Sequence, residues 1–154
     1  MIFKRTVNTY LEKWKLSKNR KPLIIRGARQ VGKTTLIQGF AEKYAHSIML
    51  NLEKPADRRY FDQFDDVHTI VEALLLAQGI PSSAMEETLL FIDEIQESPK
   101  AIQLLRYFYE DIPGIHVISA GSLLEFAMKD VRSFPVGRVE FIYLHPLNFE
   151  EYLE

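Results

Sequence analysis

A glycine-rich stretch near the N-terminus constrains the fold of this chain more than any other feature. Residues 27–34 fit the pattern G-x-x-x-x-G-K-[ST] without a mismatch and end on Lys33 and Thr34. Residues 23–25 read as a short buried strand before this stretch, and residues 34–44 as a helix after it. A loop between a strand and a helix can aim many backbone N–H donors at one point, with the helix dipole behind them. The sequence therefore predicts a phosphate-binding loop.

Each position of the loop has an expected task. Lys33 would reach the β- and γ-phosphates of a nucleotide, and the Thr34 hydroxyl would be a ligand to Mg²⁺. Gly27 and Gly32 allow backbone angles and a close approach that side chains would block. The alternative is a chance match in an ordinary turn, which the flanking strand and helix disfavour. The residues expected to hold the nucleotide are Gly27, Ala28, Arg29, Gln30, Val31, Gly32, Lys33, Thr34 and Thr35.

A second informative stretch lies in the middle of the chain. Residues 89–92 are four large apolar residues followed by Asp93 and Glu94, which is typical of a parallel strand buried on both faces. Ligands of open α/β sheets bind at the carboxyl ends of strands, so both carboxylates should reach the edge that holds the loop. We expect Asp93 to orient the metal and Glu94 to polarise an attacking water. The alternative for Glu94 is that it caps the next segment.

The candidate residues in the C-terminal half are a hydroxyl and an arginine. Residues 115–120 read as another buried strand, after which Ser122 either approaches the γ-phosphate or caps a helix over residues 123–129, or does both. Arg29 and Arg138 are candidates for stabilising charge in the transition state, Arg29 from the same or a neighbouring subunit and Arg138 as an arginine finger. The alternative for Arg138 is an ion pair with acidic residues on adjoining strands.

The remaining segments predict a chain of alternating helices and strands. Val7, Tyr10, Leu11 and Trp14 form the apolar face of a helix over residues 6–16, where an aromatic side chain either packs in the core or flanks an adenine. We expect further elements as helices at 55–64 and 67–78, a strand at 47–52, a helix that Ser98 caps and Pro99 begins, a final strand at 138–144 and a helix from Asn148. Because the chain stops just inside this last helix, we expect it to continue in a larger protein.

Size and composition exclude several classes of protein. The 154 residues suit one domain, residues 1–154, and the absence of cysteine excludes disulfides and thiolate metal sites. No apolar run is long enough to span a bilayer and no signal peptide is present, so a cytoplasmic protein is expected. Residues 1–33 hold ten Lys and Arg against one acid, Glu12. Residues 13–21 are therefore either a solvated helix end or a weak nucleic-acid patch.

Together these motifs resemble the AAA-like P-loop ATPases, and among them the bacterial and archaeal ATP-binding proteins whose loop reads G-x-R-Q-V-G-K-T. The likeness rests on residues 27–35, 89–96, 119–123, Gly137-Arg138 and 145–151. It implies a three-layer α/β fold with a mostly parallel sheet of about five strands in the order 5-1-4-3-2. Members typically continue into further helices, and often into a nuclease-like C-terminal domain, so the family's lid and effector domain would be absent from these residues.

The expected function is binding of ATP and Mg²⁺ and hydrolysis of ATP, which would drive or regulate a protein partner or effector domain. Lys33, Glu94, Ser122 and Arg138 would be the catalytic residues, and Thr34 and Asp93 would serve the metal. Homo-oligomers through Arg138 or Arg29 are possible on this reading. The alternative is a nucleotide-dependent switch that binds ATP or ADP with little turnover.

Overall fold

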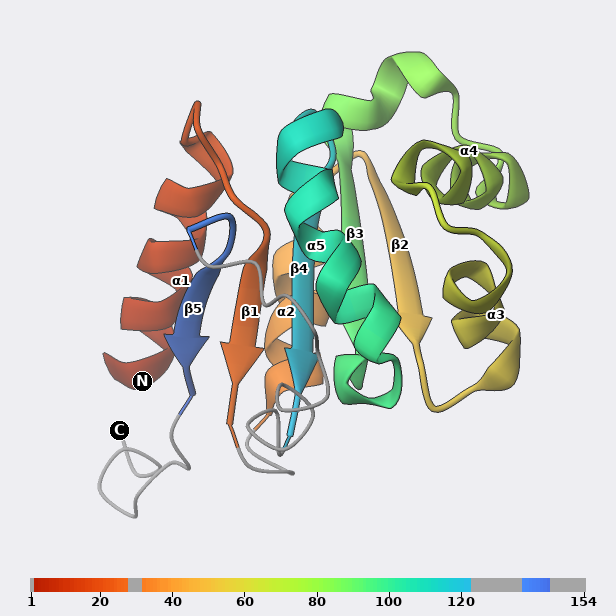
Figure 1. The fold of residues 1–154 in the computed structure, drawn as a ribbon. Helices are drawn as coiled ribbons and strands as arrows, with labels where there is room; N and C mark the ends of the chain where they lie inside the picture. Colours follow the sequence, from red (N-terminus) through yellow and green to blue (C-terminus); the bar gives the residue numbers. More distant parts are fainter. Residues whose placement is uncertain (1, 28–31, 123–136, 145–154) are drawn as a thin grey trace.

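The computed structural model describes residues 2–27, 32–122 and 137–144. A parallel sheet of five strands forms the centre of the molecule. Its strands are β1 (Leu23–Arg26), β2 (His46–Asn51), β3 (Thr88–Asp93), β4 (His116–Gly121) and β5 (Glu140–Tyr143). They lie in the order β2-β3-β4-β1-β5, and every neighbouring pair is parallel, as the arrowheads in Figure 1 show. Counted from β5, this is the expected order 5-1-4-3-2, with β4 between the strand before the loop and the strand that ends in Asp93.

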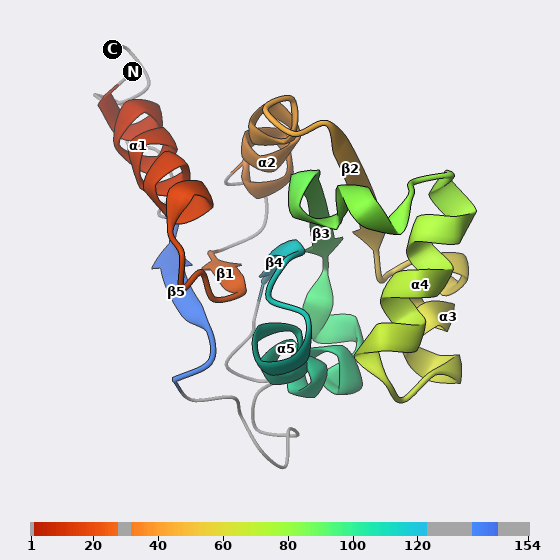
Figure 2. The same cartoon turned by 90° about the horizontal axis from the view of Figure 1, so that it is seen from above.

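Helices cover both faces of the sheet and make three layers (Figure 2). Those on the first face are α1 (Ile2–Leu16) and α2 (Lys33–Ala41), and those on the second are α3 (Pro55–Gln63), α4 (Val67–Gln78) and α5 (Pro99–Asp111). Two short 3-10 helices, η1 (Ser82–Glu87) and η2 (Ile95–Glu97), flank β3. Among the described helices, none is both long and apolar enough to cross a membrane.

Strand β3 is buried along its whole length, as its apolar run predicts. Leu90 and Ile92 belong to the core cluster under α3, α4 and α5, whereas Leu89 and Phe91 belong to the cluster under α1 and α2. Alternate side chains of a strand point to opposite faces, so a central strand between two helical layers must be apolar on both. This burial fixes the position of the strand end, which carries Asp93 and is followed by Glu94.

The helix boundaries follow local chemistry. Ser98 caps α5, where its hydroxyl oxygen accepts a hydrogen bond from the Ala101 N–H at 3.1 Å, and Pro99 occupies the first turn, as expected. Asp66 caps α4 in the same way through the Thr69 N–H at 3.2 Å. Gly79 ends α4 in the left-handed conformation, with φ of 67°, which glycine adopts without steric cost.

Some boundaries differ from those that the sequence predicts. Helix α2 ends at Ala41 instead of continuing to residue 44, because the chain tightens into i to i+3 hydrogen bonds that turn Tyr44 toward the core. Strand β5 is shorter than residues 138–144, and Arg138 lies in a turn before it. Sequence periodicity did not predict η1 and η2, since segments of three to six residues carry too little of it. The segments 123–136 and 145–154, with their expected helices and loop, lie outside the described residues.

An aromatic cluster joins α1 and α2 to the amino end of β4. The rings of Trp14 and Tyr44 pack edge-on against His116, at centroid distances of 5.8 and 5.0 Å, and Phe40 lies beside Trp14 and Tyr44. The Tyr44 hydroxyl and His116 Nδ1 share a hydrogen bond of 2.6 Å. Trp14 is therefore a core residue at the end of the sheet opposite the loop, which rules out its alternative role beside an adenine in this chain's own site.

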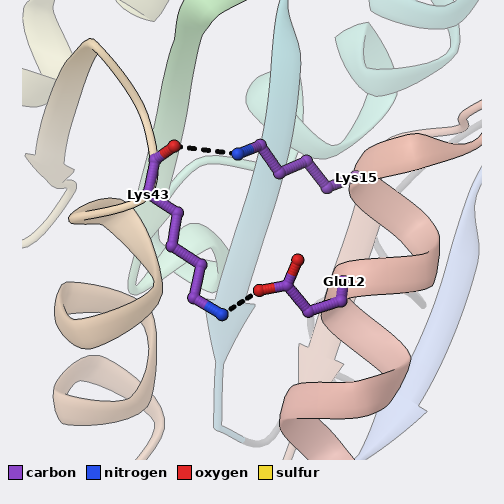
Figure 3. Close-up of polar contacts among 3 residues, drawn as sticks. All are labelled: Glu12, Lys15 and Lys43. Carbon is purple, nitrogen blue, oxygen red and sulfur yellow. Dashed lines mark hydrogen bonds and ion pairs between the residues drawn. The ribbon is translucent and has the colours of Figure 1, made fainter.

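Polar contacts reinforce the same junction (Figure 3). Lys15 Nζ donates to the backbone oxygen of Lys43 at 2.8 Å, and Lys43 Nζ forms an ion pair with Glu12. Helix α1 is thereby attached just beyond the C-terminal end of α2, whose other end carries the phosphate-binding loop. Exposed ion pairs of this kind contribute up to about 1 kcal/mol, so the aromatic packing supplies most of the stabilisation here.

His116 should make the protein less stable in mild acid. Burial, helped by the positive charges of Arg20 and Lys15, lowers the pKa of His116 to about 3. In the unfolded chain this pKa is about 6.5, so between pH 6.5 and pH 3 the unfolded state binds one more proton and stability falls as pH falls. From this residue alone we expect a loss of about 2 kcal/mol in unfolding free energy between pH 7 and pH 5. Urea unfolding at the two pH values measures it.

The control for this prediction is a histidine on the surface. His116→Phe should remove most of the loss between pH 7 and pH 5, whereas His68→Asn, at an exposed position of α4, should leave it in place. An equal pH dependence in the parent and in His116→Phe would contradict the assignment.

Candidate functional site

The phosphate-binding loop joins the carboxyl end of β1 to the start of α2. Gly32 precedes the helix in the left-handed conformation, with φ of 87° and ψ of 18°. A Cβ added there would meet no described atom within 4 Å, so the positive backbone angle is what requires glycine. The Gly32 oxygen accepts the first helical hydrogen bond from Leu36 at 2.9 Å. The predicted nucleotide-binding residues Ala28, Arg29, Gln30 and Val31 lie outside the described residues.

The side chain of Lys33 reaches back to Gly27, the first residue of the loop. Its side chain is 7% exposed, and Nζ donates a hydrogen bond to the Gly27 oxygen at 3.0 Å. A buried ammonium group needs acceptors close by, and a carbonyl of the loop supplies one. An anion inside the loop would offer this amine a stronger, charge-assisted partner.

A hydrogen bond connects the loop with the acidic strand. Thr34 Oγ1 donates to Asp93 Oδ2 at 2.6 Å, although 59 residues separate the two along the chain. Asp93 is 9% exposed, and its Oδ1 accepts from the backbone N–H of Glu94 at 2.9 Å. The predicted juxtaposition of Thr34 and Asp93 is therefore present.

These two side chains fit the demands of Mg²⁺. This ion prefers oxygen ligands and keeps several waters, so it needs only one or two protein groups besides the phosphates. The Thr34 oxygen keeps lone pairs for a cation while it donates its proton to Asp93. In the described part of the chain there is no group of three His, Cys, Asp or Glu side chains that could hold a metal ion.

Glu94 follows Asp93 with an unusual backbone. Its φ of 54° and ψ of 45° lie in the left-handed region, and it is the one non-glycine residue with positive φ among those described. This conformation costs about 1–2 kcal/mol for a residue with a Cβ. The half-buried carboxylate does not cap the next helix through its side chain, and Oε2 accepts a hydrogen bond from Gln96 Nε2 at 2.5 Å. Glu94 is nevertheless the N-cap residue of η2 through its backbone, whose oxygen accepts from the Glu97 N–H at 3.1 Å, so the alternative that Glu94 caps the next segment holds for the backbone and leaves the side chain for another task.

Ser122 lies at the same edge of the sheet, one residue beyond β4. The register aligns Gly121 with Arg26, the last residue before the loop, so Ser122 and the loop leave the sheet at the same level. Ser122 is 3% exposed, and its hydroxyl has no hydrogen-bond partner among the described residues. A buried hydroxyl without a partner is costly, so the approach of Ser122 to the γ-phosphate stays a prediction that this position allows. Its alternative role, capping a helix at 123–129, falls outside the described residues.

The structure does not bring Arg138 to this chain's own site. Strand β5 begins at Glu140, whose N–H donates to the Pro22 oxygen at 2.9 Å, so Arg138 lies at the amino end of the sheet. The loop begins at the other end of β1, about 10 Å further along the strand direction. Arg138 Nε instead pairs with Glu110 Oε1 at 2.8 Å. Arg138 therefore makes the ion pair that was its alternative role, although the partner is on helix α5 and not on an adjoining strand. Its role as a finger in the site of a neighbouring subunit stays a prediction.

The basic stretch at residues 13–21 is partly used inside the protein. Besides the contact of Lys15, the Arg20 guanidinium donates to the backbone oxygens of Lys15, Ser17 and Pro113 at 3.2 to 3.3 Å. Arg20 and Lys15 therefore hold the junction around α1, and Lys13 and Lys18 are the exposed lysines of the stretch. A nucleic-acid patch would need several cations free to meet phosphates, so the structure weakens that hypothesis.

Sequence reasoning missed one polar residue of the site, Gln96. Its amide contacts the carboxylate of Glu94 from two residues further along the chain. The available signal was its place at the end of the stretch 89–96, two residues after the acidic pair. No residue-type rule assigns a task to a glutamine at that spacing, because the contact depends on the turn at Glu94.

Comparison with known proteins agrees with this arrangement. A family model described as "AAA domain" matches residues 19–153. Among solved structures, PCH-2 of C. elegans is similar over 91% of this chain and 42% of its own, with a TM-score of 0.53 and 18% sequence identity, which supports the fold. The chain thus spans less than half of that protein. No curated protein matches the sequence of the present chain. Since the family model covers most of the sequence, including the loop and the acidic strand, this chain belongs to the AAA domain family, whose members are nucleotide-binding, ATPase-type proteins.

Proposed function

We propose that this domain binds ATP together with Mg²⁺ and hydrolyses the bond between the β- and γ-phosphates, which releases ADP and phosphate. The observation that carries the proposal is the hydrogen bond between Thr34 and Asp93, because it joins the loop and the acidic strand at one edge of the sheet. Phosphoryl transfer to water needs positioning and neutralisation of charge, with little covalent work by the protein. The side chains at this edge offer an amine, a hydroxyl, two carboxylates and a buried serine hydroxyl, all suited to that task.

Each group has a defined part in this proposal. Lys33 exchanges the Gly27 oxygen for phosphate oxygens, and the backbone N–H groups at the start of α2 add to the positive field there. Thr34 and Asp93 would hold and orient Mg²⁺, which would supply positive charge to neutralise the phosphates. Glu94 accepts a proton from the attacking water, and the Ser122 hydroxyl donates to the γ-phosphate.

A nucleotide-dependent switch is the second candidate, and the position of Arg138 favours it for an isolated chain. An arginine at the γ-phosphate can raise the rate about 10³- to 10⁵-fold, and Arg138 is paired with Glu110 far from the loop. A chain without a neighbour would then hold ATP with slow turnover. In an assembly, Arg138 or Arg29 of an adjacent subunit would complete the site. We also propose that this cycle of ATP binding and hydrolysis drives or regulates a protein partner or an effector domain.

Lys33→Ala should abolish nucleotide binding, because it removes the cation that meets the phosphates in a mostly buried position. Isothermal titration calorimetry with Mg·ATP should show a loss in affinity of at least about 100-fold, the equivalent of two charge-assisted hydrogen bonds. Lys18→Ala, at an exposed position outside the site, is the matched control and should bind as the parent does. Tight binding by folded Lys33→Ala protein would remove the loop from the proposal.

Glu94→Gln should retain ATP and lose turnover, because the amide cannot accept the proton of the water. General-base catalysis is worth about 10²- to 10⁴-fold, so we expect a fall in kcat of at least about 100-fold with an unchanged dissociation constant. Glu97→Gln, at an exposed position three residues later, should hydrolyse ATP at the parent rate. A parent protein that leaves ATP intact in a single-turnover assay with excess enzyme would favour the switch.

Arg138 should matter only between subunits. If a neighbour supplies it, specific activity rises with protein concentration in the parent and stays low and flat in Arg138→Ala. Glu110→Ala removes the same ion pair but keeps the arginine, so it should retain the concentration dependence. A flat profile in the parent, or equal losses in both variants, would assign Arg138 to the ion pair alone.

A further inference from the structure

The contact between Gln96 and Glu94 has a defined direction. Gln96 lies in η2, half-buried, and the 2.5 Å contact joins its side-chain amide group to Glu94 Oε2. An ionised carboxylate only accepts hydrogen bonds, so the amide must present its N–H group, since the opposite orientation would bring two acceptors together. Gln96 therefore donates to one oxygen of the glutamate, and the second oxygen remains available.

Maintaining this contact has an energetic cost on both sides. With Nε2 turned to Glu94, Gln96 Oε1 is buried and has no hydrogen-bond partner within the ranges that the structure describes. Glu94 itself has the strained left-handed backbone that begins η2. Buried polar atoms without partners and strained residues persist where the surroundings fix them, and they cluster at functional sites. An apolar side chain at position 96 would avoid the first of these costs.

We propose that Gln96 is a positioning residue that orients the Glu94 carboxylate for the attacking water. The terminal torsion of a glutamate is soft, so a free carboxylate rotates and seldom presents the same oxygen. A charge-assisted hydrogen bond to Oε2 restricts this rotation and leaves the other oxygen to accept from a water. This inference rests on the proposed hydrolysis, and it adds a residue whose effect passes through Glu94.

The main test is Gln96→Met, which keeps the length of the side chain and removes the amide. We expect kcat to fall about 10- to 100-fold, the range that loss of orientation of one catalytic group produces, while the dissociation constant of Mg·ATP stays within about twofold. The melting temperature should stay equal or rise, because the unpartnered amide oxygen is gone. Gln103→Met, at another half-buried glutamine in α5, is the control and should keep the parent kcat.

A double-mutant comparison shows whether Gln96 works through Glu94. In the Glu94→Gln background, Gln96→Met should lower the single-turnover rate by less than about twofold, because the group that it orients no longer acts as a base. A further fall of the same size as in the parent background would overturn the proposal. An increased kcat in Gln96→Met would also overturn it, since the amide would then restrain Glu94 from acting.

The contact can also be measured without turnover. In nucleotide-free protein, the ¹⁵N and ¹H signals of the Gln96 side-chain amide should shift when Glu94 is changed to Leu, and those of Gln103 should stay in place. Absence of that shift contradicts the contact. A parent that binds ATP without hydrolysing it would overturn the proposed function and this role together, whereas a hydrolysing parent with an unaffected Gln96→Met variant would overturn this role alone.

Discussion

The parallel pairing of the strands is the constraint on which the rest of this structure depends. Because β1, β3 and β4 run in the same direction, their carboxyl ends meet at one edge, and the chain leaves that edge through the loop, through Asp93 and Glu94, and through Ser122. An antiparallel neighbour would send one of these segments to the opposite end. The 2.6 Å hydrogen bond from Thr34 to Asp93 is a direct consequence of this pairing.

The two-sided burial of β3 turns that arrangement into a rigid one. Its apolar side chains pack into both helical layers, so the strand end cannot move without opening both clusters. Strain is concentrated just beyond this rigid part, at the left-handed Glu94 and the unpartnered oxygen of Gln96. A well-packed core thus supports a local geometry that would be unfavourable in a short peptide.

The end of the sheet opposite the loop serves stability. There the aromatic cluster around His116, the carbonyl contacts of Arg20 and the pair of Arg138 with Glu110 join helices to strands. These basic residues also show why charge counted along a sequence overstates a binding surface. A cation that donates to backbone oxygens of its own protein is less available to a phosphate, and the sequence does not separate the two cases.

Residue types at short spacing were enough to predict the order of most elements, the pattern of the loop, the capped start of α5 and the buried acidic strand. The general rule on strand ends also predicted that Thr34 and Asp93 lie together. Two features needed the folded molecule, namely the place of Arg138 at the far end of the sheet and the contact of Gln96 with Glu94. The first depends on which end of β5 lies beside the start of β1. The second depends on a left-handed turn that the packing of the whole domain holds in place, and neither can be read from neighbouring residues alone.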